Sequence, residues 1–78
     1  MAANECSGET AKSVEKLKEI ALKAAYSDER KKAIEALAEF ETCGVPALTE
    51  IAKEATFSDE RKLAIEKISE AMSKAKTK

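Results

Sequence analysis

Apolar residues recur along this chain at spacings of three and four positions, which is the spacing of one face of an α-helix. Two such stripes contain Val14, Leu17, Ile20, Ala21 and Ala24, and then Val45, Leu48, Ile51, Ala52 and Ala55. Two more contain Ala33, Ile34, Leu37 and Phe40, and then Ala64, Ile65, Ile68 and Met72. No segment sustains an alternation of period two. We therefore predict four helices, at about 11–25, 28–41, 45–56 and 59–75, and no strands.

The helical pattern occurs twice, 31 positions apart. Residues 26–37 read YSDERKKAIEAL, and residues 57–68 read FSDERKLAIEKI. When residues 14–44 are aligned with residues 45–75, fifteen of the 31 pairs are identical. Such a period is typical of repeat proteins, in which each unit buries its apolar side against its neighbour. We predict an all-α fold of four antiparallel helices that form two stacked helical hairpins, with the main apolar side chains buried.

Local signals mark the ends of the helices. Ser27 and Ser58 are expected to cap the free amides of the helices that follow them. Each serine precedes an Asp-Glu pair, and the dipole of the first helical turn favours such negative charge. Gly44 is expected to take the left-handed conformation that ends a helix, and Pro46 suits the first turn of the next helix. Residues 1–10 are expected to be a flexible tail before a single helical domain at 11–78.

The composition narrows the classes of protein. Of the 78 residues, 44% are hydrophobic and 37% are charged, which is too apolar for a disordered chain and too charged for a membrane protein. The formal net charge is −1, whereas nucleic acid and anionic lipid need a basic surface. We expect neither a nucleic acid nor a membrane as a partner. The first ten residues do not resemble a secretory signal, so we expect a cytoplasmic location.

Two further compositional features bear on the environment of the chain. Cys6 and Cys43 are too few and too far apart to indicate a disulfide framework, and we expect free thiols, with an intermolecular or conditional disulfide as the alternative. Glutamine and histidine are absent while lysine and glutamate are abundant, which is a thermophile-like composition.

The chain offers little for catalysis. Without histidine it lacks the commonest general base near neutral pH and the commonest metal ligand. Two isolated cysteines do not make a zinc site, and two glycines do not make a glycine-rich phosphate loop. We expect no catalytic residue, no metal and no cofactor, and we expect that the chain is not an enzyme.

The stretch GVPALTEIAKEATFSDERKLAIEKI resembles a HEAT repeat of the short, 31-residue kind. The V-P-A-L element at 45–48 matches the first helix of that repeat, and Arg61, Ala64 and Glu66 match the second. The first unit matches at Arg30, Ala33 and the Glu-Ala-Leu at 35–37. The resemblance covers residues 12–75. Glu29 and Glu60 depart from the usual valine before the arginine, and Ala38 and Ser69 depart from the usual glycine.

The resemblance implies a non-catalytic scaffold for protein–protein contact, in which the second helix of each unit lines the face that binds the partner. On this chain the candidate face is Asp28, Lys31, Lys32, Glu35, Asp59, Lys62, Leu63 and Glu66. These residues also lie opposite the apolar stripes, so they are expected to face solvent. The alternatives are a structural homo-oligomer, because two units leave two unstacked ends, and an accessory subunit of a cofactor-modifying enzyme.

Differences between the two units leave several interpretations open. Leu22 and Leu63 replace lysines of the other unit, and they are either buried at the ends of the stack or part of a contact surface. Tyr26 and Phe57 are expected to cover the core at a helix turn. Arg30 and Arg61 are expected to tie adjacent units together through acidic side chains, with a phosphate or carboxylate ligand as the alternative.

Overall fold

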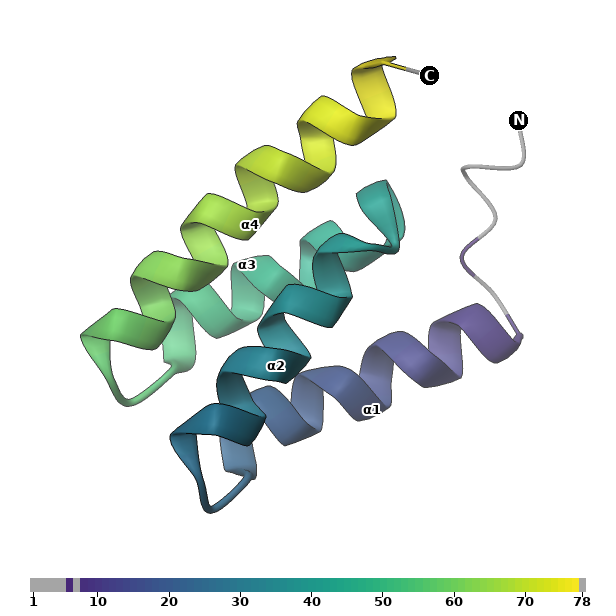
Figure 1. Cartoon of the computed structure of the whole chain (residues 1–78). Helices are drawn as coiled ribbons and strands as arrows, with labels where there is room; N and C mark the ends of the chain where they lie inside the picture. Colours follow the sequence, from purple (N-terminus) through teal and green to yellow (C-terminus); the bar gives the residue numbers. More distant parts are fainter. Residues whose placement is uncertain (1–5, 7, 78) are drawn as a thin grey trace.

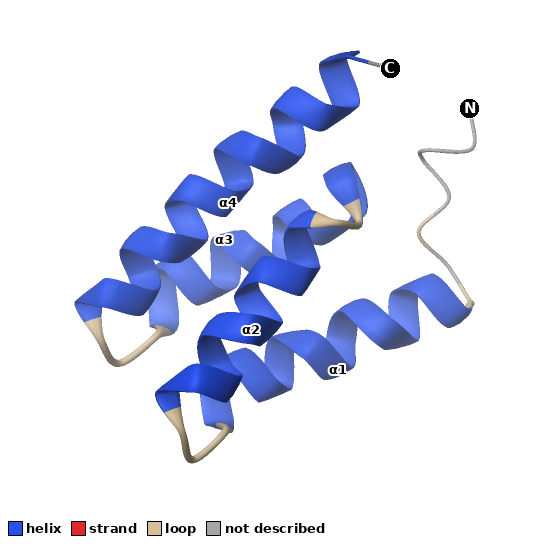
Figure 2. Cartoon of the chain, in the orientation of Figure 1, coloured by secondary structure: helices blue, strands red, loops and turns tan. Residues whose placement is uncertain are grey.

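Four α-helices make up the fold. The computed structural model describes residue 6 and residues 8–77, with side chains as far as residue 74. The helices are α1 (Glu9–Lys23), α2 (Ser27–Ala38), α3 (Val45–Glu54) and α4 (Ser58–Thr77), and a short 3₁₀ helix, η2 (Glu41–Gly44), joins α2 to α3. The part of the chain described here contains no strand (Figure 2). The predicted all-α class is therefore confirmed.

The helices form two hairpins that lie side by side. The first hairpin is α1 and α2, and the second hairpin is α3 and α4. Helix α2 lies centrally and contacts α1, α3 and α4, while α1 also contacts α3 (Figure 1). One layer thus contains α1 and α3, and the other contains α2 and α4. This arrangement agrees with the two stacked hairpins that the repeat predicts. Among the described residues, each hairpin has one side that the other hairpin does not cover.

The core lies between and within the two hairpins. Its largest fully buried side chains are Ile34, Leu37, Leu48 and Ile51, which the small side chains of buried alanines surround. The prediction that the main apolar side chains of the stripes are buried is wrong at three positions. Ile20 is 44% exposed, Ile65 is 57% exposed and Met72 is 48% exposed. Ile20 and Ile65 each lie on a side of their hairpin that the other hairpin does not cover.

Helices α2 and α4 each begin one residue earlier than the capping prediction requires. The backbone carbonyl of Tyr26 accepts the first helical hydrogen bond of α2, from the amide of Arg30 at 3.1 Å, and Phe57 does the same for Arg61 in α4. Ser27 is therefore already inside α2, and no side chain caps that helix. The capping role predicted for Ser27 is wrong, and Ser58 is likewise the first residue of α4. The acidic first turns are confirmed.

The turn between the hairpins differs from the glycine cap that we expected. Gly44 has a φ of −85°, whereas Glu41 takes the left-handed conformation, with a φ of 57°. Gly44 is needed for a different reason, because a Cβ atom at this position would lie 2.0 Å from the backbone oxygen of Leu37. The close approach of the turn to the end of α2 therefore requires a glycine. Pro46 lies in the first turn of α3, as predicted.

Cys6 and Cys43 form a disulfide, so the expectation of free thiols is wrong. The bond joins the segment before α1 to η2, and their separation of 37 residues encloses the whole first hairpin. The folded chain brings together two thiols whose spacing in the sequence gave no sign of proximity. The predicted flexible tail, 1–10, falls largely outside the described residues. Of its described part, Glu9 and Thr10 are helical and Cys6 is covalently attached to η2.

Within the described residues, no helix combines the length and the apolar character that crossing a membrane requires.

The disulfide predicts a clear effect of reduction on stability. A cross-link over a loop of this size lowers the entropy of the unfolded chain, so reduction should lower the free energy of unfolding by about 2–4 kcal/mol. For a domain of this size, the melting temperature should then fall by roughly 10 °C or more. Circular dichroism melts with and without reductant measure the effect. The matched control is the double variant Cys6→Ser/Cys43→Ser, whose melting temperature should not respond to reductant. Equal melting of the wild type in both conditions would contradict the prediction.

Candidate functional site

The predicted partner-binding face lies on α2 and α4, and the structure divides it into two parts. Six of its eight residues line one groove of about 380 Å³ between the two helices, which we call the α2–α4 groove. These six are Lys31 and Glu35 from α2, and Asp59, Lys62, Leu63 and Glu66 from α4. The remaining two, Asp28 and Lys32, border a different hollow. Most of the eight side chains are exposed, and Lys31 and Leu63 are half-buried.

Charges of both signs surround one apolar side chain in the α2–α4 groove. The two lysines and three carboxylates come from two neighbouring helices, and Leu63 lies among them. Leu63 also packs against the hydrophobic core, as Leu22 does on α1. Both leucines are therefore partly buried within the molecule. Leu63 in addition contributes its exposed part to the groove.

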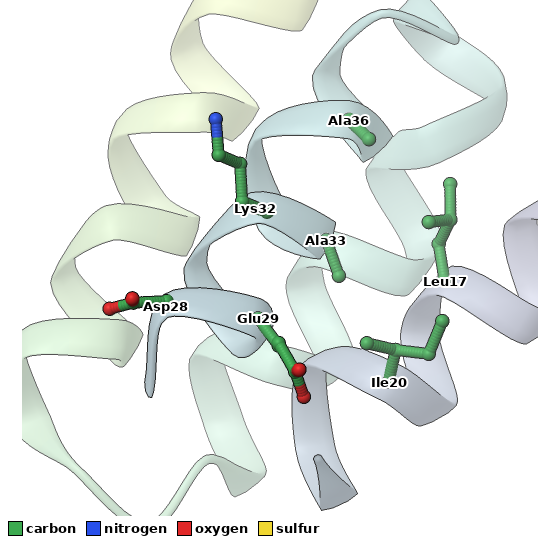
Figure 3. A pocket seen from close by; sticks show the side chains of 7 residues that line it. All are labelled: Leu17, Ile20, Asp28, Glu29, Lys32, Ala33 and Ala36. Carbon is green, nitrogen blue, oxygen red and sulfur yellow. The ribbon is translucent and has the colours of Figure 1, made fainter. Parts of the chain in front are cut away.

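Asp28 and Lys32 border a second hollow, of about 480 Å³, on the outer side of the first hairpin. We call it the outer hollow. Its apolar lining comes from Leu17 and Ile20 of α1 and from Ala33 and Ala36 of α2, and Glu29 completes it (Figure 3). Sequence reasoning did not predict this site, although it did predict that two units leave two unstacked ends. The exposure of Ile20 marks this site, but the sequence does not reveal it, because the same residue type stands at this position in both repeats.

A buried ion pair joins the two hairpins. The Nε atom of Arg30 on α2 donates to both carboxylate oxygens of Glu60 on α4, at 2.9 and 3.0 Å. Glu60 is 2% exposed. The Nη1 atom of Arg30 also donates to the carbonyl oxygen of Ala24, at 2.7 Å. The prediction that this arginine ties adjacent units together is therefore confirmed at Arg30.

Arg61, the counterpart of Arg30 in the second hairpin, repeats only the contact with a backbone carbonyl. Its Nη1 atom donates to the carbonyl oxygens of Ala55 and Thr56, at 2.8 and 3.2 Å. The bond to Ala55 repeats the bond from Arg30 to Ala24. No carboxylate of the described residues pairs with Arg61. The predicted tie between units is therefore not made at this position within the chain.

The two aromatic residues at the hairpin turns are exposed, so the prediction that they cover the core is wrong. Tyr26 is 69% exposed and Phe57 is 52% exposed. The Phe57 ring lies beneath the guanidinium of Arg30, with 5.0 Å between the ring centroid and Cζ, which is the geometry of a cation–π contact. Each aromatic residue directly precedes its helix, where the apolar stripe has not yet begun. Phe57 therefore contributes to the contact between hairpins through its ring face.

The remaining ion pairs lie at the surface and contribute little to stability. Lys67 pairs with Glu70 and Lys74 pairs with Glu39, at 3.2 and 3.0 Å. Lys18 pairs with Glu15 at 3.1 Å, and this hydrogen bond raises the pKa of Lys18 above its ordinary value. Among the described residues, no group of three or more acidic, cysteine or histidine side chains is placed to hold a metal ion.

In comparisons with known proteins, no protein-family model, curated protein or solved structure matches the chain.

The buried ion pair predicts unequal effects at two equivalent glutamates. Glu60→Ala should lower the free energy of unfolding by about 3 kcal/mol, because it leaves the Arg30 guanidinium partly buried without its counter-charge. Glu29→Ala is the matched control, since Glu29 occupies the same helical position in the first hairpin but is exposed. It should cost less than about 1 kcal/mol, from the helix dipole alone. Urea unfolding at low protein concentration measures both values, and equal losses would show that the ion pair contributes nothing.

Proposed function

We propose that this chain is a non-catalytic protein–protein interaction module, a small HEAT-like repeat scaffold that binds a segment of another protein in the α2–α4 groove. The observation that carries the proposal is the convergence of six candidate residues from α2 and α4 on that groove. Further support comes from the 31-residue period, from the stacked hairpins and from the arginine that bonds across the units. In HEAT-like proteins, which this chain resembles, the second helices line the surface that binds partners.

The charges of the α2–α4 groove define the chemistry of the proposed partner. Its two lysines and three carboxylates are interspersed, so a ligand of one sign meets repulsion as well as attraction. A phosphate backbone is therefore a poor fit, because its binding depends on a uniformly basic surface. The groove instead fits a short protein segment that carries an apolar side chain for Leu63 and flanking charges of both signs. Such charge patterns confer specificity more than affinity.

Variants on the two layers of the molecule test the proposed binding surface. A double variant, Lys62→Glu/Leu63→Lys, reverses one charge of the α2–α4 groove and removes its apolar side chain. Lys53→Glu on α3 is the matched control, because Lys53 is exposed and lies in the other layer. Immobilised wild-type chain and the two variants are compared for proteins that they retain from a native lysate.

The proposal expects a protein that the wild type and Lys53→Glu retain equally, and that the groove variant retains at least tenfold less. Circular dichroism should show that all three chains are folded. Retention by all three chains would place the binding surface elsewhere. Enzymatic turnover by the chain, with no protein retained, would contradict the proposed class of function.

The cytoplasmic location remains a proposal, and two observations bear on it. Disulfides persist mainly in oxidising compartments, with the cytoplasm of hyperthermophiles as the known exception. The lysine- and glutamate-rich, glutamine-free composition supports that exception for the Cys6–Cys43 bond. We therefore propose a cytoplasmic protein of a thermophile.

The proposed thermophilic origin predicts high thermal stability. With the disulfide intact, the chain should melt above about 70 °C, outside the range of roughly 45–65 °C that is usual for mesophile domains. A calorimetric scan measures this value. A midpoint of about 50 °C would contradict the thermophile proposal, and with it the reason for placing a disulfide protein in the cytoplasm.

A further inference from the structure

The contact between the hairpins has two sides, one on each hairpin. The counterpart of each side lies on an outer surface of the stack. Positions 31 apart are equivalent in the two hairpins, so each internal contact has a counterpart at an end. Ile51 of the second hairpin is fully buried, whereas its counterpart Ile20 is 44% exposed. Ile34 of the first hairpin is fully buried, whereas its counterpart Ile65 is 57% exposed. The exposed members of these pairs lie at opposite ends of the stack.

The outer hollow is the uncovered counterpart of a surface that the first hairpin covers on the second. Leu17, Ile20, Glu29 and Ala33 line the hollow. Their counterparts Leu48, Ile51, Glu60 and Ala64 are all buried. Where a hairpin lies against them all four residues are therefore covered, whereas at the outer hollow Ile20 and Glu29 are exposed, Leu17 is half-buried and Ala33 is buried.

The charged groups at the two ends are complementary in the same way. Inside the molecule, Arg30 bonds Glu60 and its guanidinium lies over Phe57. The counterparts are Arg61 at one end, and Glu29 with Tyr26 at the other. Glu29 and Tyr26 are exposed, and neither has a side-chain ion pair or hydrogen bond within the described part of the chain. The Nε atom of Arg61 likewise has no carboxylate among the described residues, although its Nη1 atom is held by the carbonyl of Ala55.

We propose that copies of this chain associate head to tail, so that the outer side of the second hairpin of one copy covers the outer hollow of the next. In this contact Ile65 enters the hollow beside Ile20, as Ile34 packs in the internal core. Arg61 donates to Glu29 of the next copy, and its guanidinium lies over Tyr26 of that copy. The contact repeats an interface that the chain already forms, and this equivalence is the reason for choosing a second copy as the occupant.

The symmetry of the contact predicts the form of the assembly. Each copy uses two different surfaces, so the interface is heterologous and leads to a ring or to an open chain of copies. Stacking also supplies each end hairpin with the neighbour that repeat units need, since roughly three units are usually required for stability. The inference does not depend on the proposed partner in the α2–α4 groove, because the residues that carry it lie at the two ends of the stack.

Charge-reversal variants and their mixture test this interface. Glu29→Arg and Arg61→Glu each place like charges across every contact in a pure sample, so each variant alone should remain at the monomer mass of 8.5 kDa. An equimolar mixture restores an unaltered contact, between Arg61 of the first variant and Glu29 of the second. The mixture should therefore associate although neither component does.

Sedimentation equilibrium between about 10 µM and 1 mM covers the range expected for an interface of this small size. Across it, the weight-average mass of the wild type should rise at least twofold. Ile65→Asp should abolish the rise, while Lys23→Glu should leave it unchanged, because Lys23 and its counterpart Glu54 are both exposed. Both substituted side chains are exposed, and circular dichroism should confirm that every variant is folded.

Three outcomes would overturn the inference. If the wild type stays monomeric at about 1 mM, the two ends do not bind a second copy, and their partner would be the hairpins of another protein. Association of the single charge variants to the same extent as the wild type would place the contact elsewhere. A mixture that remains monomeric, while the wild type associates, would show that Arg61 and Glu29 do not meet. None of these outcomes affects the test of the α2–α4 groove, whose variants alter other residues.

Discussion

The contact between the two hairpins is the interaction on which the rest of the structure depends. The four largest fully buried side chains come in equal numbers from each hairpin, Ile34 and Leu37 from the first and Leu48 and Ile51 from the second. These side chains pack into one core cluster, so each hairpin supplies part of the apolar surface that covers the other. This constraint accounts for the core, for the α2–α4 groove along the junction and for the two apolar ends where no neighbour is present.

The Arg30–Glu60 pair gives this contact a defined register. A buried ion pair adds little net stability over apolar packing, because both charges lose their hydration. A buried glutamate that loses its partner is costly, however, and a shift of one hairpin along the other would produce that state. Arg30 is itself held by the carbonyl of Ala24, so the pair fixes α4 relative to the turn between α1 and α2. The same requirement accounts for the buried acidic residue at position 60.

The candidate site could be predicted from the sequence only in part. Helical periodicity places Lys31, Glu35, Lys62 and Glu66 on the polar side of their helices, and the structure brings them together in one groove. The separation of Asp28 and Lys32 into another hollow depends on how α1 and α2 diverge, which periodicity does not describe. The exposure of Tyr26 and Phe57 was missed because an aromatic residue at a turn has no helical face to indicate its direction.

The sequence by itself determined the four helices, the 31-residue repeat and the arginine that joins the units, because these follow from local spacing and from repetition. Only the tertiary structure decided which copy of each repeated residue is buried. Ile20 and Ile51, or Glu29 and Glu60, are identical in type and position, yet one of each pair is exposed and the other is covered. The tertiary structure also decided the disulfide and the need for Gly44, since both arise from segments that are distant in sequence and close in space. Burial and proximity of this kind depend on the neighbour that the fold supplies, and a residue's own type and spacing do not contain that information.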